Sequence, residues 1–365
     1  MRVLVVTLFS RTSGSSRVMA FQFLSLLRAQ GVETDVITIY PDEFFNVQMG
    51  LVPKNRWSKS LNFGVHLVRG MLMRVRAALA ARRYDAVYVQ RDAFPAVLLR
   101  VLKANNPRIV YEFEDSFSST NPFLHERGLV HRALLTYQLG LFRNMVKEAS
   151  HVIAVNQQVA DEAATVNAKV TVVCEPLDMS RYRALPARPA SNDLVIGWIG
   201  SPSTTRFLHP VAAALRRLCE KYPSLVVRVV GAATDLALPG VRLDRRSWSS
   251  ETEIADLVSF DIGICPLHEH PFYQRHLSHK MVQYMAVGIP VVAQRCGVNA
   301  SVVTDGDNGF LCDGDDDWVE RLSQLLDDVG LRRRLGKNGR AIALDRFALE
   351  KQATVLGDIL RSVAR

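Results

Sequence analysis

Short apolar runs alternate with longer amphipathic segments along almost the whole chain. Two early runs, VLVVTL (3–8) and TDVITIY (34–40), flank RVMAFQFLSLLRAQG (17–31), whose apolar residues recur at three- and four-residue spacing. The other strand-like runs of the first half are DAVYVQ (85–90), RIVYEFE (108–114), HVIAV (151–155) and VTVVC (170–174). Strand-like runs that alternate with helical segments indicate a parallel sheet with helices on both faces, so we expect an α/β fold.

The alternation is interrupted once, near the middle of the chain. RALPARPASND (183–193) has two prolines and no apolar periodicity, which is typical of a linker. The alternation restarts in LVIGWIG (194–200), SLVVRVVG (224–231), FDIGICP (260–266) and IPVVAQ (289–294). A chain of 365 residues is too long for one ordinary core. We therefore expect two Rossmann-like domains, 1–186 and 187–346, whose parallel sheets face each other across a cleft, and a last helix, 347–365, packed back on the first domain.

Composition excludes several other classes of protein. With 48% apolar and 22% charged residues the chain has an ordinary globular composition, and no stretch approaches the roughly 18 apolar residues of a membrane-spanning helix. The apolar run at the amino terminus is too short for a signal peptide. The five cysteines are scattered, without a CxxC pair or a Cys/His cluster. We therefore expect a cytoplasmic protein with no metal site and no cofactor.

The positive charge is concentrated in the first half of the chain. Residues 1–186 hold 23 Lys/Arg against 15 Asp/Glu, whereas the remainder holds 22 against 21. Residues 54–83 are basic without one acidic residue and carry an apolar stripe at helical spacing: Leu61, Val65, Val68, Leu72, Val75 and Leu79. This segment is expected either to lie on an anionic membrane surface at the cytoplasmic face or to be a core-facing helix with a basic outer side. We expect no nucleic-acid partner, because no nucleic-acid-binding module accompanies the basic residues.

Loops that follow strands hold the candidate binding residues, since ligands of open parallel sheets bind beyond the carboxyl ends of the strands. SRTSGSSRV (10–18) joins the first strand to a helix, and Gly14 with its neighbouring serines could offer N–H groups to an anion. A plain serine cap is the alternative. Polar residues also follow two later strands: Gln90 and Arg91 after one, Glu114 and Asp115 after the other.

A glycine- and serine-rich loop occupies the equivalent place in the second half. In GWIGSPSTTRFL (197–208), Gly200 and Ser201 allow a ligand to approach the main chain closely. Arg206 could grip a diphosphate with its guanidinium, or could be a solvated arginine.

A later helix of the second half carries two further candidates. HKMVQYMAVGIPVVA (279–293) predicts a helix that ends at Gly288, followed by a strand that Pro290 opens. Lys280 and Gln283 lie three residues apart in its first turns, so they are neighbours on the helix surface. A solvated lysine is the alternative for Lys280.

Several of these stretches resemble one family. KMVQYMAVGIPVVA (280–293), GVNASVVTDGDNGFL (297–311) and LRRRLGKNGRAIALDRFALE (331–350) resemble the nucleotide-binding domain of family-4 glycosyltransferases. The acceptor-side domain of that family is similar to GSSR (14–17), YDAVYVQRDAFP (84–95), YEFEDSFS (111–118) and HVIAVNQQVADEA (151–163). The resemblance implies a GT-B fold and transfer of a sugar from a nucleotide-diphosphate sugar to an acceptor, with retention of anomeric configuration and without a metal ion.

The resemblance also assigns donor-side roles, with two departures. Two glutamates with seven residues between them are usual in the family; their places are taken here by Arg275 and Gln283. Gln283 can still exchange hydrogen bonds with ribose hydroxyls, whereas Arg275 reverses the charge at the sugar contact. Arg206 and Lys280 are expected to bind the diphosphate, and main-chain N–H groups near His276 the sugar.

On the acceptor side the resemblance implies positioning rather than an enzymic base. The family is thought to let the leaving phosphate assist deprotonation of the acceptor, so catalysis rests on geometry and on stabilisation of the departing diphosphate. Arg91, Glu114 and Asp115 are the candidates to orient the acceptor hydroxyl, although both acids could merely cap the next segment. We expect a glycan or lipid-linked acceptor in cell-surface polysaccharide or glycolipid synthesis. A nucleotide-sugar epimerase or hydrolase on the same fold and a non-catalytic nucleotide-sugar-binding protein are the alternatives.

Overall fold

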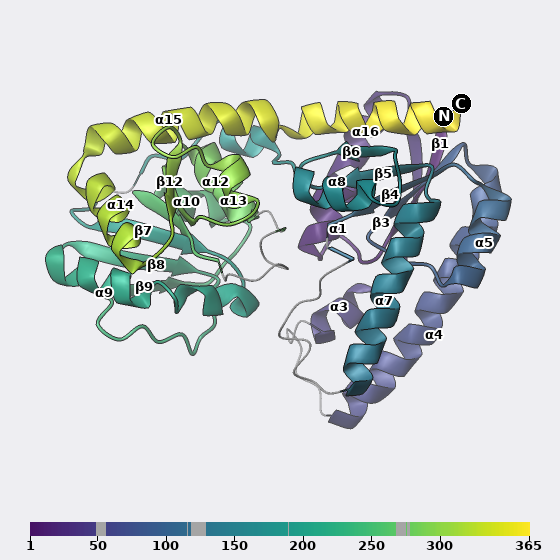
Figure 1. The fold of residues 1–365 in the computed structure, drawn as a ribbon, viewed down its shortest axis with the longest axis horizontal. Coiled ribbons are helices and arrows are strands. Elements are labelled where there is room, and N and C mark those ends of the chain that lie inside the picture. The colour runs from purple at the N-terminus through teal and green to yellow at the C-terminus, as the bar shows by residue number, and fades with distance from the viewer. Residues whose placement is uncertain (49–55, 115, 118–128, 189, 268–274, 276–277) are drawn as a thin grey trace. The chain divides into compact units, whose positions relative to one another are not determined.

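The computed structural model describes residues 1–48, 56–114, 116–117, 129–188, 190–267, 275 and 278–365. These residues form two compact units, Met1–Pro176 with Leu349–Arg365, and Leu177–Ala348 (Figure 1). The first unit ends before the expected residue 186, because the segment after Pro176 is bonded within the second unit. There the Leu177 N–H donates to the Phe347 carbonyl over 2.8 Å, and the Arg340 guanidinium donates to the Tyr182 carbonyl over 2.7 Å.

The first unit contains a six-stranded, all-parallel sheet in the order β2-β1-β3-β4-β5-β6. Its strands are β1 (Arg2–Thr7), β2 (Glu33–Thr38), β3 (Ala86–Gln90), β4 (Ile109–Phe113), β5 (His151–Ala154) and β6 (Val170–Val172). Its helices are α1 (Gly14–Met19), η1 (Phe21–Phe23), α2 (Leu24–Ala29), α3 (Asp42–Gln48), α4 (Arg56–Ala80), η2 (Ala81–Arg83), α5 (Ala96–Asn105), α7 (Leu129–Glu148), α8 (Gln157–Ala164) and α16 (Leu349–Ala364). The strand order changes direction between β1 and β3, which makes that point of the sheet edge the expected binding place.

The second unit repeats this architecture, with a parallel sheet in the order β12-β11-β10-β7-β8-β9. Its strands are β7 (Leu194–Ile199), β8 (Leu225–Val230), β9 (Leu243–Arg246), β10 (Ile262–Cys265), β11 (Val291–Gln294) and β12 (Gly309–Cys312). Its helices are η3 (Met179–Tyr182), η4 (Pro202–Leu208), α9 (Ala212–Lys221), α10 (Glu253–Val258), α12 (His279–Val287), α13 (Asn299–Val302), α14 (Asp315–Asp327) and α15 (Val329–Arg346). The predicted α/β class with two parallel sheets is confirmed, although β9 and β12 were not expected.

The last helix, α16, packs in the first unit against α2 and strands β3 and β4 (Figure 1). One side of the helix is fully buried through Ala353, Leu356 and Leu360. Its amphipathic pattern therefore supplies core to the sheet of residues 1–176 although it is the last element of the chain.

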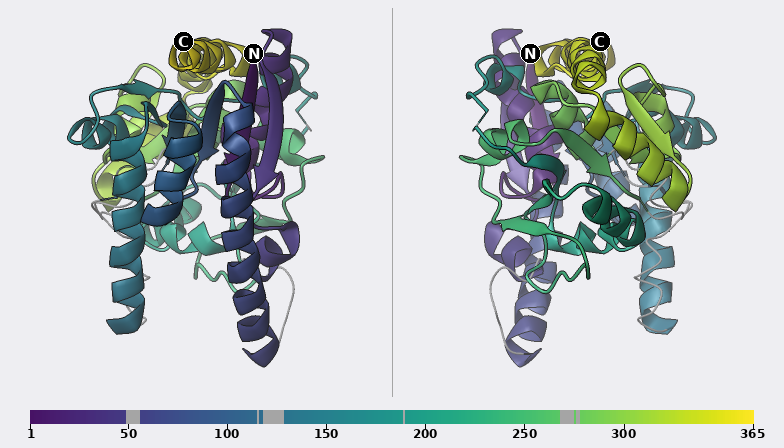
Figure 2. Two further views of the ribbon diagram at one scale, coloured as in Figure 1. Left: turned by 90° about the vertical axis from the view of Figure 1, so that its right-hand side faces the viewer. Right: turned by 90° about the vertical axis from the view of Figure 1, so that its left-hand side faces the viewer.

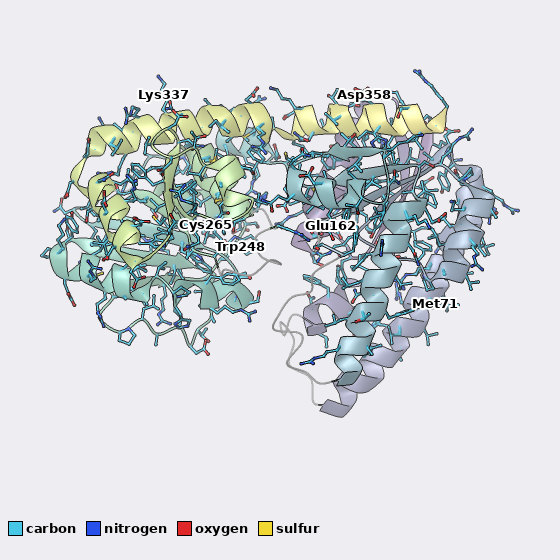
Figure 3. The ribbon with its side chains drawn as sticks, in the orientation of Figure 1. Met71, Glu162, Trp248, Cys265, Lys337 and Asp358 are labelled. Carbon is cyan, nitrogen blue, oxygen red and sulfur yellow. The ribbon has the colours of Figure 1, made fainter. Side chains whose placement is uncertain are left out.

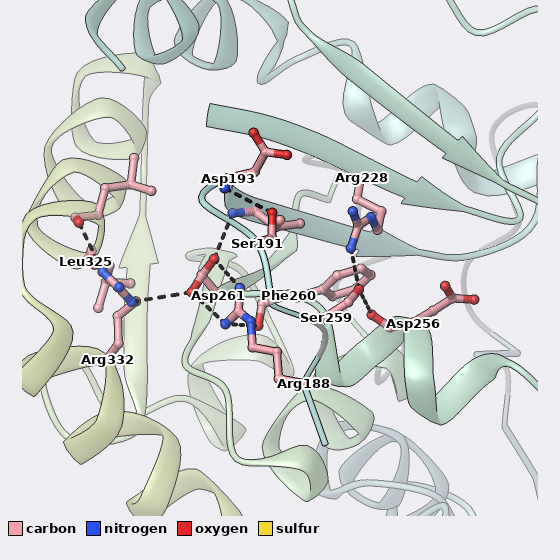
Figure 4. Close-up of polar contacts among 12 residues, drawn as sticks. Arg188, Ser191, Asp193, Arg228, Asp256, Ser259, Phe260, Asp261, Leu325 and Arg332 are labelled. Carbon is pink, nitrogen blue, oxygen red and sulfur yellow. Dashed lines mark hydrogen bonds and ion pairs between the residues drawn. The ribbon is translucent and has the colours of Figure 1, made fainter. Parts of the chain in front are cut away.

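Asp261, at the amino end of β10, ties the predicted linker to the second sheet (Figure 4). Its carboxylate accepts two hydrogen bonds from the Arg188 guanidinium, over 2.7 and 2.6 Å, and one from the Val195 N–H over 2.8 Å. The Arg332 guanidinium of α15 lies 3.9 Å away. The described part of the linker is thus held to the second sheet at Arg188, before β7 begins.

The turn between α12 and β11 is fixed from outside by α15. Gly288 adopts φ +78°, the left-handed conformation that ends a helix with little strain only at glycine. Gly336 of α15 packs directly on it, and a Cβ at Gly336 would overlap the Gly288 carbonyl oxygen. The Arg340 guanidinium also donates to the Ala286 carbonyl. These contacts set where α12 lies.

Helix α4 exposes the apolar stripe predicted within residues 54–83. Val65, Val68, Leu72 and Leu79 are 57, 63, 59 and 54% exposed, and Figure 2 shows α4 extending past the sheet, as α7 does separately. Met71, labelled in Figure 3, is exposed as well. The core-facing interpretation is therefore wrong for the described part of this stripe. No described helix of the chain is apolar enough over sufficient length to cross a membrane.

Candidate active site

Polar side chains meet at the carboxyl ends of β1, β3 and β4 in the first unit. Gln90, the last residue of β3, is fully buried; its carboxamide accepts from the Ser16 hydroxyl over 2.9 Å and donates to the Ser15 hydroxyl over 3.1 Å. Ser15 in turn donates to the Glu114 carboxylate after β4. The serines after Gly14 therefore join a network across three strands, whereas Ser13 is the residue at the cap position of α1.

Arg91 and Glu114, both predicted from sequence, are brought together. The Arg91 guanidinium lies 3.2 Å from the Glu114 carboxylate, and both side chains are largely shielded from solvent. Arg91 has φ +57°, and it is the one non-glycine residue with positive φ in the described part of the chain. The predicted partner Asp115 lies outside the described residues. A left-handed arginine facing a carboxylate at a sheet edge is the kind of strained geometry that gathers at functional sites.

Glu112 is a member of this cluster that the sequence did not reveal. It lies inside β4, fully buried, as the register partner of Gln90. Burial raises the pKa of its carboxyl well above the usual value, and the charge of Glu114 raises it further, against the opposing effect of Arg91. Neither carboxyl oxygen has a hydrogen-bond partner among the described residues. An acid at an inward position of an otherwise apolar parallel strand was the available signal.

In the second unit, Lys280 and Gly200 both lie against Trp198, the fully buried indole near the end of β7. The Lys280 ammonium is 4.5 Å from the centre of the ring. A Cβ at Gly200 would overlap the far edge of the same ring, so this position must lack a side chain. Burial lowers the pKa of Lys280, and no described carboxylate forms an ion pair with it. A shielded cation that faces an indole ring beside bare main chain favours an anionic ligand.

Tyr284 ties the middle of α12 to the point where the strand order of the second sheet reverses. Its hydroxyl accepts from the Ile199 N–H of β7 over 3.0 Å and donates to the Ile264 carbonyl of β10 over 3.3 Å. Lys280 lies one turn earlier on the same helix. The sequence alone could not place Lys280 here, because its position depends on this link between two strands.

Three other donor-side candidates, Ser201, Arg206 and Gln283, make contacts within their own surroundings. Ser201 caps η4 through a reciprocal bond with Thr204, and the Arg206 Nε donates to the Ser203 carbonyl over 2.9 Å. Gln283 is buried near the Tyr182 hydroxyl, whose pKa burial raises to about 12.

Two donor-side candidates lie in the loop before α12. Arg275 is half-buried in a turn, and His276 lies outside the described residues. Within the described ranges no group of three or more His, Cys, Asp or Glu side chains could hold a metal ion.

Two family matches cover both units. The family described as glycosyl transferases group 1 matches residues 188–342, and glycosyltransferase family 4 matches residues 16–181. The chain is a member of the group 1 glycosyltransferases. The expected family resemblance is thus confirmed.

Curated relatives of this glycosyltransferase match over parts of their length. D-inositol 3-phosphate glycosyltransferase of Corynebacterium kroppenstedtii is 36% identical over 198 residues, 47% of this chain and 41% of the relative. Glycogen synthase of Mycobacterium tuberculosis is 22% identical over 237 residues, 60% of this chain and 56% of the relative. The chain thus spans about half the length of these relatives.

Solved structures agree with the group 1 glycosyltransferase fold over the full chain. HepE of Anabaena in complex with UDP has a TM-score of 0.66 at 17% identity, covering 99% of this chain and 100% of that one. A glycosyltransferase of Rickettsia africae has a TM-score of 0.71 at 12% identity, covering 100% and 98%. At these identities the likeness concerns the fold, and it confirms the predicted GT-B architecture.

Proposed function

We propose that the protein transfers a hexosyl group from a nucleotide-diphosphate sugar to an acceptor hydroxyl, with retention and without a metal ion. The observation that carries the proposal is Lys280, a shielded cation held on Trp198 at the reversal point of the second sheet, with no ion-pair partner among the described carboxylates. A donor diphosphate supplies the negative charge that this site lacks. Structures of HepE contain UDP and UDP-glucose, which supports the same donor class here.

The donor-side roles follow from this placement. Lys280 and Arg206 bind the diphosphate, and the bare main chain at Gly200 and Ser201 lets the phosphates approach. Gln283, which is buried near the Tyr182 hydroxyl, takes the ribose contact. We assign the contact with the sugar or its phosphate to Arg275 and to the main chain of His276, which lies outside the described residues.

The acceptor-side roles rest on the network of the first unit. Gly14 begins α1, whose serines connect to Glu114, and Arg91 holds the same carboxylate. Glu114, with Arg91 and Asp115, orients the acceptor hydroxyl, while the departing phosphate takes its proton. Preorganised charges of this kind act on the transition state without a covalent intermediate.

The acceptor is a glycan or a lipid-linked saccharide, and helix α4 brings the protein to the cytoplasmic face of an anionic membrane. This part of the proposal is supported by the exposed apolar stripe of α4 and by the arginines beside it, Arg69 and Arg76, which are also exposed. Basic residues flanking an exposed apolar helix face favour anionic lipid. The product would then enter cell-surface polysaccharide or glycolipid synthesis.

Product analysis with and without acceptor tests the proposed reaction. The protein is incubated with a panel of nucleotide-diphosphate sugars, first alone and then with glycan and lipid-linked acceptors. A glycosylated product formed only with acceptor supports transfer, and its anomeric configuration tests retention. Turnover of donor without acceptor identifies an epimerase or a hydrolase instead. Stabilisation by nucleoside diphosphates with no turnover identifies a non-catalytic binding protein.

A further inference from the structure

Arg74 of α4 and Asp92 form a buried ion pair beneath the acceptor-side network. The Arg74 Nε donates to one carboxylate oxygen of Asp92 over 2.9 Å, and its terminal nitrogen donates to the other over 2.5 Å. Asp92 is fully buried, and the Arg74 side chain is 11% exposed. Tyr40 lies over the guanidinium, 5.5 Å from its ring centre. Burial opposes the charge of Arg74, yet the Asp92 carboxylate raises its pKa above the usual value.

Asp92 directly follows the strained residue of the site. The Asp92 N–H donates to the Gln90 carbonyl over 2.7 Å, which closes a three-residue turn with Arg91 at its centre. The Arg91 N–H donates to the Glu112 carbonyl over 2.9 Å, so the main chain is held on both sides of this residue. The turn carries the positive φ of Arg91 and leads its guanidinium to Glu114.

We propose that Asp92, clamped by Arg74, is a positioning residue that forces Arg91 into the left-handed turn and so aims the Arg91 guanidinium at Glu114. A bidentate arginine–carboxylate pair fixes both orientation and distance. Strained conformations of this kind persist where surrounding contacts determine them. The inference deepens the proposed function and rests on it only in naming the acceptor as the ligand that Arg91 and Glu114 receive.

A simpler role for the pair would be to hold α4 on the sheet. Removal of either partner from a buried pair destabilises a protein in any case, so loss of stability alone does not separate the two roles. They differ in what happens when Arg91 is already absent. A positioning residue that acts through Arg91 then has nothing left to position.

A kinetic double-mutant cycle uses this difference. Asp92→Asn is expected to lower kcat/KM for the acceptor on the order of tenfold or more while leaving the KM for the donor unchanged. In an Arg91→Ala background the same change is expected to cost nothing further. Arg74→Lys, which keeps the charge but not the bidentate contact, is expected to behave like Asp92→Asn and replaces it if that variant does not fold. Asp261→Asn, which breaks a matched arginine–aspartate pair of the second unit, is expected to lower the melting temperature without selective loss for the acceptor.

A second cycle measures the turn itself and does not depend on catalysis. Arg91→Gly and Arg91→Ala both remove the guanidinium, so their difference reports the main chain at this position. With Asp92 in place, the glycine variant is expected to melt a few degrees higher than the alanine variant. With Asp92→Asn, or with Arg74→Lys, that advantage is expected to disappear.

The two cycles separate failure of the inference from failure of the proposed function. An unchanged advantage of glycine over alanine after loss of the Arg74–Asp92 pair would overturn the positioning role. Equal kinetic losses from Asp92→Asn with and without Arg91 would overturn it as well. If no transfer is detected with any donor, the proposed function fails, and the melting temperatures of the second cycle still decide whether the pair imposes the turn.

Discussion

The Lys280 ammonium lies 4.5 Å from the centre of the ring of Trp198, a residue of β7, the strand that pairs with β10 where the strand order of the second sheet reverses. The indole face attracts the cation but cannot neutralise it. The charge of Lys280 is therefore available for a ligand, and substitution of Lys280 is the most direct test of donor binding.

Lys280→Ala is expected to weaken binding of a nucleoside diphosphate such as UDP by about 1.5–3 kcal/mol, the range of a hydrogen bond to a charged group. Isothermal titration calorimetry measures the change. Lys221→Ala, which removes an exposed lysine of α9, is the control and is expected to leave the affinity unaltered. Equal affinities of Lys280→Ala and the unmodified protein would exclude Lys280 from the diphosphate site.

The affinity for a nucleoside diphosphate is expected to fall as the pH rises, and to do so at a lower pH than at a site with a solvent-exposed lysine. Burial lowers the pKa of Lys280, so the free protein loses this proton at a lower pH and then lacks the cation. Lys280→Arg keeps its charge at all relevant pH values and is expected to flatten the profile. Titrations between neutral pH and pH 10 test this, and parallel profiles for both proteins would argue against titration of Lys280.

Gly200→Ala is expected to destabilise the protein by about 1–3 kcal/mol, because the new Cβ overlaps the Trp198 ring and forces the core to shift. Movement of the indole also displaces Lys280, so nucleotide affinity should fall. Gly140→Ala is the matched control, because the site on α7 has open space around the added methyl group. Replacing a helical glycine by alanine is expected to raise the free energy of unfolding by about 0.5–1 kcal/mol. Urea unfolding compares the two, and an unaffected Gly200→Ala would show that the loop yields easily.

Glu112→Gln is expected to stabilise the protein increasingly as the pH rises above 4.5. The pKa of Glu112 is raised in the folded state, so the folded protein binds more protons than the unfolded chain above that pH. The stability linked to Glu112 is thus present at low pH and is lost as the pH rises through the folded-state pKa. Glutamine removes this loss. Urea unfolding at several pH values measures the difference, and a constant difference would mean that Glu112 does not titrate as its burial requires.

Leu72→Ser combined with Val68→Ser is expected to reduce binding to vesicles that contain anionic lipid, because each change removes an exposed apolar contact from α4. Arg76→Glu is expected to weaken binding by about 1 kcal/mol or more. Leu344→Ser, at an exposed leucine of α15, is the control. Vesicle flotation measures binding, and equal flotation of all variants would remove α4 as the lipid contact.

Much of the fold follows from sequence because apolar periodicity directly reflects burial. β1, predicted at 3–8, is Arg2–Thr7 in the structure. β9 escaped prediction since LDRR is an edge strand with charged side chains and no apolar run.

The buried face of helix α4 could not be predicted from the pattern of its large apolar residues. Its buried side is lined by small residues, Gly70, Ala77 and Ala78, because the helix packs closely on its neighbours. The larger apolar residues are left outside. A rule that puts the largest apolar residues in the core selects the wrong face here.

Site residues could be predicted where their position along a strand determines their place in the fold. They could not be predicted where a contact between distant elements determines it. Arg91 and Glu114 follow adjacent strands, so parallel register brings them together. The ion pair of Arg74 with Asp92, and the contact of Lys280 with Trp198, join segments whose approach no local pattern encodes.

The packing of Gly336 on the Gly288 carbonyl has a consequence for variation in this chain. Neither glycine is a candidate binding residue, yet a side chain at Gly336 would push α12 away from α15, and one at Gly288 would strain the left-handed turn that ends α12. In a saturation mutagenesis screen, both glycines should tolerate substitution as poorly as the candidate binding residues do. A loss-of-function variant at Gly336 would therefore show that α12 depends on its packing against α15. A second-site suppressor is best sought among the residues around the Gly288 turn.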